Sequence, residues 1–280
     1  MSNPVRPIRS QMGRRPAPPA VPGVSVSAAV PMIRLALRAL TMAAALLACL
    51  PPHYLWRLSG RPSPWPRRFL DWVTRAAGMR VTVIGTPLRR DVLFLANHLS
   101  WLDILVVAGA SGAAFVAKAE VAATPVIGWL ARLNKTVFVA RAERSGVRGQ
   151  ADALRSALAG GQPVALFPEG TTDGGPQVLP FRASLLASLF PPLPGVLVQP
   201  IALDYGAAAD DLAWIGDESG LANVRKVLSR RGTTPVTLHF LAPVDPASGD
   251  RKALALAARA EIVEALGKPL GPSGGGADRL

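Results

Sequence analysis

Two segments of the sequence carry residues of the types and spacing that acid–base chemistry needs. The first, residues 97–103, reads Asn-His-Leu-Ser-Trp-Leu-Asp and follows an apolar run over residues 92–96. An imidazole accepts a proton near neutral pH, and a neighbouring carboxylate orients the ring and stabilises its charged form. His98 and Asp103 are therefore candidates for a general base and its partner.

The same segment also has a structural interpretation. Ser100 and Asp103 have the spacing of a capping box, in which the Ser side chain accepts one free backbone N–H at a helix start and the acid accepts another. Asp103 would then lie near the positive end of the helix dipole. The two interpretations are compatible, because a helix that begins here brings the carboxylate across its first turn towards His98.

The second segment, residues 167–175, reads Phe-Pro-Glu-Gly-Thr-Thr-Asp-Gly-Gly and lies at the end of another apolar run. In open α/β sheets, ligands bind beyond the carboxyl ends of the strands. We therefore expect the two polar segments to face one crevice. Taken alone, Glu169 fits a loop acid or a helix cap equally well.

Together the two segments resemble the 1-acylglycerol-3-phosphate O-acyltransferases, a lysophospholipid acyltransferase family. Its first motif is Asn-His-x-Ser-x-x-Asp and its third is Phe-Pro-Glu-Gly-Thr. Residues 137–141, Val-Phe-Val-Ala-Arg, are similar to the second motif, and residues 198–202, Val-Gln-Pro-Ile-Ala, are similar to the fourth. All four occur in the family's order, which makes the set far more specific than any one motif.

This resemblance implies a mechanism. His98 would act as general base on a lysolipid hydroxyl that attacks the thioester of acyl carrier protein or acyl-CoA, and Asp103 would hold the imidazole in the right tautomer. No covalent acyl-enzyme is required, so Ser100 is interpreted as a cap. Backbone N–H groups near Ser100 are candidate donors to the tetrahedral oxyanion on geometry alone. No cofactor is implied besides the acyl thioester.

The resemblance also assigns substrate-binding and supporting residues. Arg141 would pair with a head-group phosphate through its planar guanidinium; beside Glu143 and Arg144 it would otherwise be interpreted as solvent-facing. The residues implied to line the head-group site are Glu169, Gly170, Thr171 and Thr172. The supporting residues are Asn97, Ser100, Pro168 and Pro200. The sequence shows no three-ligand metal spacing, so no metal is expected.

Thr172 departs from the family pattern, because many members carry Arg after Glu-Gly-Thr. Sequences with Glu-Gly-Thr-Thr occur in members resembling the lyso-ornithine lipid acyltransferases, and residues 214–218, Trp-Ile-Gly-Asp-Glu, resemble that branch too. We expect the conversion of 1-acylglycerol-3-phosphate to phosphatidic acid first. The alternatives are acylation of lyso-ornithine lipid and, more distantly, a non-catalytic basic membrane-surface module.

The elements that position these residues follow from the alternation of short β-branched runs with helical stretches. Strands are expected at 81–84, 92–96, 114–117, 137–140, 164–167, 197–203 and 236–241, and helices at 150–159 and 251–266 among others. The pattern predicts an α/β fold with a largely buried mixed sheet covered by helices. We expect a disordered segment at 1–31, a membrane-associated helical segment at 32–79, the acyltransferase domain at 80–266 and a flexible tail at 267–280.

The distribution of charge favours a membrane partner. The net charge is +13, and residues 1–100 account for +12 of it, with 14 Arg, no Lys and two Asp. These Arg residues flank apolar sequence and accompany no nucleic-acid-binding motif, so we expect membrane lipids and no nucleic acid, at the cytoplasmic face of the inner membrane. A single cysteine, Cys49, excludes an intrachain disulfide and fits a reducing compartment.

Two N-terminal stretches could provide the attachment. Residues 39–50 are apolar up to Pro51-Pro52, which is short of the ~20 residues that cross a bilayer and favours an interfacial or half-inserted helix. A lipoprotein signal ending at Cys49 is the alternative, disfavoured because the run begins far from Met1. Residues 64–78 carry Trp65, Trp72 and three Arg, typical of a helix in the headgroup layer or of one packed on the core.

Overall fold

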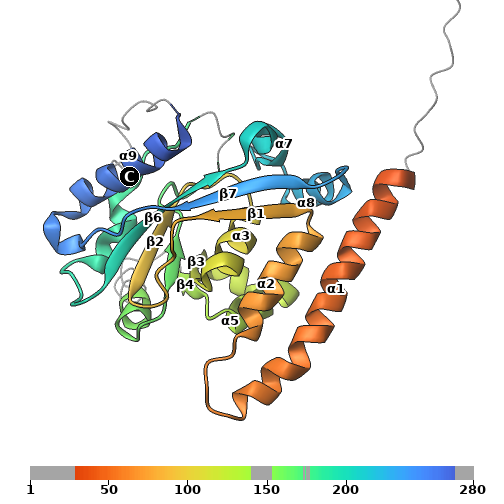
Figure 1. The fold of residues 1–280 in the computed structure, drawn as a ribbon, viewed down its shortest axis with the longest axis horizontal. Helices are drawn as coiled ribbons and strands as arrows, with labels where there is room; N and C mark the ends of the chain where they lie inside the picture. Colours follow the sequence, from red (N-terminus) through yellow and green to blue (C-terminus); the bar gives the residue numbers. More distant parts are fainter. Residues whose placement is uncertain (1–28, 140–152, 173, 175–176, 269–280) are drawn as a thin grey trace, which may run out of the picture.

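The computed structural model describes residues 29–139, 153–172, 174 and 177–268. In this part of the chain a seven-stranded sheet is flanked by helices (Figure 1), with the strand order β1-β7-β6-β2-β5-β3-β4. The strands are β1 Met79–Ile84, β2 Val92–Ala96, β3 Ala114–Lys118, β4 Val137–Val139, β5 Val164–Leu166, β6 Leu197–Asp204 and β7 Thr234–Phe240. The expected mixed α/β sheet is confirmed.

The α-helices are α1 Ala29–Arg57, α2 Trp65–Ala76, α3 Leu102–Ser111, α4 Ala119–Ala123, α5 Pro125–Leu133, α7 Ala209–Leu212, α8 Gly220–Ser229 and α9 Arg251–Leu266. Three short 3-10 helices are η1 Ala183–Leu189, η2 Gly206–Ala208 and η3 Pro246–Ser248. Residues 153–159 are also helical, and the start of the helix expected at 150–159 lies outside the described residues. The expected N-terminal disordered segment and C-terminal tail lie outside them as well, except for residues 29–31 and 267–268.

The centre of the sheet determines where the polar segments meet. β2 pairs in parallel with both β5 and β6, and the antiparallel pair is β6 with β7. Leu95 of β2 lies opposite Leu166 of β5, so the two strands end at the same edge of the sheet. The segments that follow them, which begin at Asn97 and Phe167, therefore leave the sheet side by side.

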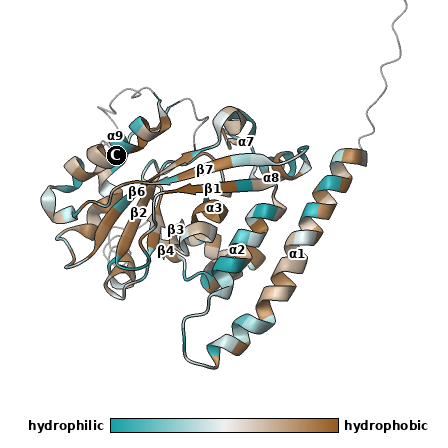
Figure 2. Cartoon of the chain, in the orientation of Figure 1, coloured by the Kyte–Doolittle hydropathy of each residue, from teal (hydrophilic) through white to brown (hydrophobic). Residues whose placement is uncertain are grey.

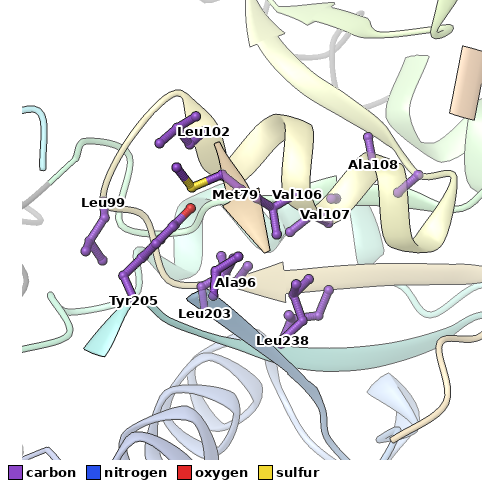
Figure 3. Close-up of a cluster of buried hydrophobic side chains, with 14 of the residues drawn as sticks. Met79, Ala96, Leu99, Leu102, Val106, Val107, Ala108, Leu203, Tyr205 and Leu238 are labelled. Atoms are coloured by element: carbon purple, nitrogen blue, oxygen red, sulfur yellow. The ribbon is translucent and has the colours of Figure 1, made fainter. Parts of the chain in front are cut away.

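Two apolar layers cover β2, whose five residues are all buried. Val92, Phe94 and Ala96 point into a cluster that includes α3 and Tyr205 (Figure 3). Leu93 and Leu95 point into the other cluster, which includes η1, α9 and residues 153–159. Alternate side chains of a strand point to opposite faces of the sheet, and a strand covered on both faces is apolar at every position.

Helix α1 is longer than the apolar run over residues 39–50. It begins at Ala29 and continues through Pro51 and Pro52 to Arg57. The φ of proline is compatible with a helix, although each proline lacks the N–H of a helical hydrogen bond and crowds the preceding turn. Residues 30–57 are long and apolar enough to cross a membrane, by length and composition alone.

Arginine side chains attach α1 to the α/β domain. Arg38 donates to the carbonyls of Val227, Leu228 and Gly232 at 3.2, 3.2 and 2.7 Å, and Arg34 donates to Ser229 O at 3.0 Å. Cationic donors are favourable at a helix C-terminus, where carbonyls lack partners. Part of the N-terminal positive charge therefore serves the fold by capping α8.

Helix α2 packs on the core along one side, as the second of its two interpretations predicted. Val73 and Thr74 are buried, and Arg67 donates to Gly109 O and Ala110 O at the end of α3, at 3.1 and 3.0 Å. Trp72 remains 41 % exposed. Helix α2 thus contacts both α1 and α3, and much of it is hydrophilic, as the teal colour in Figure 2 shows.

Helix α1 exposes a set of large apolar side chains. Its exposed members include Met32, Ile33, Leu37, Leu40, Leu47, Leu55 and Trp56. An exposed apolar patch of this kind marks a contact with a membrane or a partner.

We expect Leu40→Asp combined with Leu47→Asp to weaken binding to phosphatidylglycerol-containing vesicles by about tenfold or more, because each exposed Leu would otherwise be buried in lipid. Sedimentation with vesicles measures this. The matched control is Leu256→Asp on α9, because Leu256 is 66 % exposed, like Leu40 (67 %) and Leu47 (70 %), but lies in another helix. Equal vesicle binding by the double variant and the control would contradict a membrane role for α1.

Candidate active site

The loop between β2 and α3 brings His98 and Asp103 together. His98 Nδ1 lies 2.8 Å from Asp103 Oδ2, and the carboxylate is fully buried while the His98 side chain is 17 % exposed. An ionised carboxylate can only accept hydrogen bonds, so Nδ1 carries a proton and Nε2 is the nitrogen available as a base. Nε2 has no hydrogen bond to any described residue, which leaves it open to a substrate.

Four donors surround the buried Asp103 carboxylate. Besides the His98 ring, Oδ2 accepts the backbone N–H groups of Leu99 at 2.7 Å and Ser100 at 2.9 Å, and Oδ1 accepts the Tyr205 hydroxyl at 2.6 Å. Burial, and then the charge and hydrogen bond of Asp103, raise the pKa of Tyr205 well above its usual value. The phenol therefore keeps its proton and remains a donor, and together the four bonds offset the cost of burying a charge.

This arrangement corrects two details of the sequence-based interpretation. The helix begins at Leu102, and the Ser100 hydroxyl makes only a 3.5 Å contact with Leu102 N–H, so the carboxylate provides the main part of the capping box. The N–H groups of Leu99 and Ser100 are directed at Asp103. They are thus not available to an oxyanion, and the expectation of oxyanion donors near Ser100 was wrong for these two groups.

Phe167 fixes the plane of the His98 ring. The two rings stack with centroids 3.9 Å apart and planes 7° from parallel, and Phe115 lies behind Phe167 at 5.5 Å. An aromatic face on one side opposes rotation of the imidazole out of this plane. The position of Phe167 directly after β5 was the signal that could have assigned it this role.

Glu169 connects the two polar loops. Its Oε1 accepts the His98 backbone N–H at 2.8 Å and its Oε2 accepts the Leu179 N–H at 3.1 Å, and the residue is only 3 % exposed. The expected meeting of the two segments is therefore present. The carboxylate faces the protein's own backbone, so its geometry supports positioning of His98 more directly than contact with a head group.

The supporting residues hold the strand ends. Asn97 accepts Leu203 N–H at 2.8 Å and donates to Leu203 O at 3.0 Å, so its side chain extends the pairing of β2 with β6 by one residue. Pro200 lies inside β6 opposite Leu95. The Pro168 carbonyl accepts Arg182 N–H at 2.9 Å.

The rest of the second segment divides between exposed and bonded residues. Gly170 has a φ of +73°, a conformation that favours glycine, and Thr171 is exposed. Thr172 donates its hydroxyl to the backbone carbonyl of Trp214 at 2.6 Å, and the backbone N–H of Trp214 donates to the carbonyl of Leu99 at 2.9 Å. Thr172 therefore braces the loop of His98. Arg141 lies outside the described residues.

Sequence reasoning did not identify Tyr205. It is a polar aromatic residue directly after β6, the strand next to β2, and this position is the signal that could have identified it.

Within the described residues, no group of three or more His, Cys, Asp or Glu is placed to hold a metal ion. The arrangement as a whole is that of a base held by a buried acid at a sheet edge.

Comparisons with known proteins agree with this chemistry. A family model described as Acyltransferase matches residues 80–204. A lyso-ornithine lipid O-acyltransferase of Rhodobacter capsulatus is 36 % identical over 84 % of this chain and 91 % of its own length, and one of Brucella abortus is 34 % identical over 80 % and 90 %. A 1-acyl-sn-glycerol-3-phosphate acyltransferase of Neisseria gonorrhoeae is 38 % identical over 41 % of this chain and 44 % of its own.

A solved structure shares the fold. The crystal structure of the 1-acyl-sn-glycerophosphate acyltransferase of Thermotoga maritima matches with a TM-score of 0.56 and 24 % identity, covering 86 % of this chain and 100 % of that one. At this level of identity the likeness concerns the fold.

We expect Tyr205→Phe to lower the free energy of unfolding by about 1–3 kcal/mol, because Asp103 Oδ1 loses its donor inside the core. The urea midpoint measures the change. Tyr54→Phe is the matched control, since Tyr54 is 47 % exposed on α1 and its hydroxyl bonds to no described residue. If both variants unfolded like the wild type, the Tyr205 hydroxyl would contribute nothing to holding the carboxylate.

Proposed function

This chain belongs to the Acyltransferase family of lysolipid O-acyltransferases, and on that premise we propose that its acceptor is lyso-ornithine lipid. The full-length similarity supports this acceptor. The relatives that align over most of both chains bear the lyso-ornithine name, whereas the alignment with the Neisseria enzyme covers less than half of each chain. The acceptor placed first by the sequence, 1-acylglycerol-3-phosphate, becomes the second candidate.

The observation in the site that carries the proposal is the bonding of Thr172. Its hydroxyl is donated to Trp214 O, so this position contributes a neutral brace and no cation. A phosphate monoester carries nearly two negative charges and needs several donors or cations. An N-acylated ornithine carries one carboxylate and one ammonium group, and a site with less positive charge suits it better.

The proposed chemistry starts at His98 Nε2. It removes the proton of the acceptor hydroxyl while the oxygen attacks the thioester carbonyl carbon, and the tetrahedral intermediate then collapses with cleavage of the C–S bond. The imidazolium returns the proton to the leaving thiolate, so an ester and a free thiol are formed. Asp103 keeps the Nδ1 proton throughout and stabilises the charged ring. The acyl donor is an acyl carrier protein or coenzyme A thioester.

The location we propose is the cytoplasmic face of the membrane that holds the lipid acceptor. The exposed apolar side of α1 provides the attachment, and the N-terminal arginines that do not cap helices favour this face.

A second acceptor, 1-acylglycerol-3-phosphate, is supported by the Neisseria alignment, which has 38 % identity over 114 residues.

Purified protein supplied with each lysolipid in turn distinguishes the two acceptors. We expect O-acylation of lyso-ornithine lipid to exceed that of 1-acylglycerol-3-phosphate by about tenfold or more in kcat/KM, as measured by mass spectrometry of the products. Turnover of the phosphate acceptor alone would contradict the proposed acceptor.

The control variant for this assay is His98→Ala. Its turnover of either lysolipid should fall by about a hundredfold or more, because the general base is lost, while vesicle binding and the urea midpoint stay near those of the wild type. Near-normal turnover would show that the reaction does not depend on His98.

A further inference from the structure

Arg182 lies beside the loop that follows β5 and has no role in the mechanism above. It stands directly before η1, and its backbone is fixed at both ends of the residue. Its N–H donates to Pro168 O at 2.9 Å, and its carbonyl accepts Leu185 N–H at 3.0 Å. The base of this side chain is therefore held against the loop that follows β5.

The guanidinium of Arg182 covers the backbone of Gly170. Its Cζ, Nε and Nη1 atoms would lie 3.3–3.4 Å from a Cβ placed on Gly170, so a side chain at that position would compete with the guanidinium for space. Gly170 directly follows Glu169, which binds the backbone N–H of His98. A cation is thus placed one residue away from the group that positions the base.

The guanidinium donors of Arg182 are not used by the described part of the protein. The residue is exposed, and its side chain makes no hydrogen bond or ion pair with any described residue. Arg259 on α9, by contrast, is buried and donates to the carbonyls of Val178 and Leu179, on the same segment as Arg182. Arg38 and Arg67 likewise donate to helix carbonyls. The fold accounts for those guanidinium groups but not for that of Arg182.

We propose that Arg182 binds the anionic group of the acceptor head group, a carboxylate or a phosphate. A guanidinium offers parallel N–H donors that match either oxyanion. The nearby carboxylate of Glu169 is engaged by two backbone N–H groups, and Thr172 adds no charge. The inference rests on the proposed function in that it takes the acceptor to be a lysolipid whose head group carries an anionic group, and for lyso-ornithine lipid the ligand is the ornithine carboxylate.

The test compares Arg182→Gln with wild type on two acceptors, lyso-ornithine lipid and its carboxylate methyl ester. We expect the KM for the free acid to rise about ten- to a hundredfold in the variant, which is the usual range for losing a charged hydrogen bond. The KM for the methyl ester and that for the acyl thioester should stay the same. Arg182→Lys keeps the charge and should give an intermediate KM.

Arg231→Gln is the matched control, because Arg231 is exposed, bonds to no described residue and lies in the turn before β7. Its KM values should equal those of the wild type, and the urea midpoints of all variants show that they are folded. An equal effect of Arg182→Gln on acid and ester would overturn the proposal. A change in the KM of the thioester alone would assign Arg182 to the acyl donor and overturn it too.

The outcome for Arg182 is separable from the outcome for the acceptor. If wild type acylates 1-acylglycerol-3-phosphate and not lyso-ornithine lipid, the proposed function fails. The same comparison then uses 1-acylglycerol-3-phosphate against monoacylglycerol, which lacks the phosphate. A loss confined to the phosphate acceptor supports Arg182 as the anion-binding group, and an equal effect on both acceptors contradicts it.

Discussion

The buried Asp103 carboxylate is the group on which the geometry of the site depends. It accepts hydrogen bonds from the His98 ring, from two backbone N–H groups of the same loop and from Tyr205. A buried charge is costly unless it is fully bonded, so these donors cannot move independently of it. One carboxylate thereby fixes the loop backbone, the start of α3 and the tautomer of the base together.

The rest of the fold positions that carboxylate and the loop around it. Parallel pairing of β2 with β5 brings the two polar segments to one edge, where Glu169 joins them. Asn97 fastens the end of β2 to β6, and Thr172 with Trp214 braces the loop from the other side. The hydrogen bonds that Arg259 donates to Val178 and Leu179 extend this support to α9. Glu169 and Trp214, from two separate stretches, therefore bond directly to the backbone of the loop that carries His98.

Local patterns predicted the strands well and the long-range contacts poorly. The run at 92–96 matches β2 in full, and the spacing of His98 and Asp103 predicted their contact because both lie within one turn. Tyr205 contacts Asp103 because of the strand order, and Arg182 contacts Gly170 because of the path of its loop. Neither contact can be predicted from local residue spacing. The length of α1 does not follow from its apolar run, because the helix continues through Pro51 and Pro52, where proline more often ends or kinks a helix.

The position of the proton on the neutral His98 ring is the most direct test of a base at Nε2. The chain has three histidines, so ¹⁵N NMR of the imidazole nitrogens gives few signals, and a His98→Gln variant identifies those of His98 by their loss. At a pH where the ring is neutral, the hydrogen bond to Asp103 predicts a protonated Nδ1 and an unprotonated Nε2. A proton on Nε2 in the neutral ring would contradict general-base catalysis by this nitrogen.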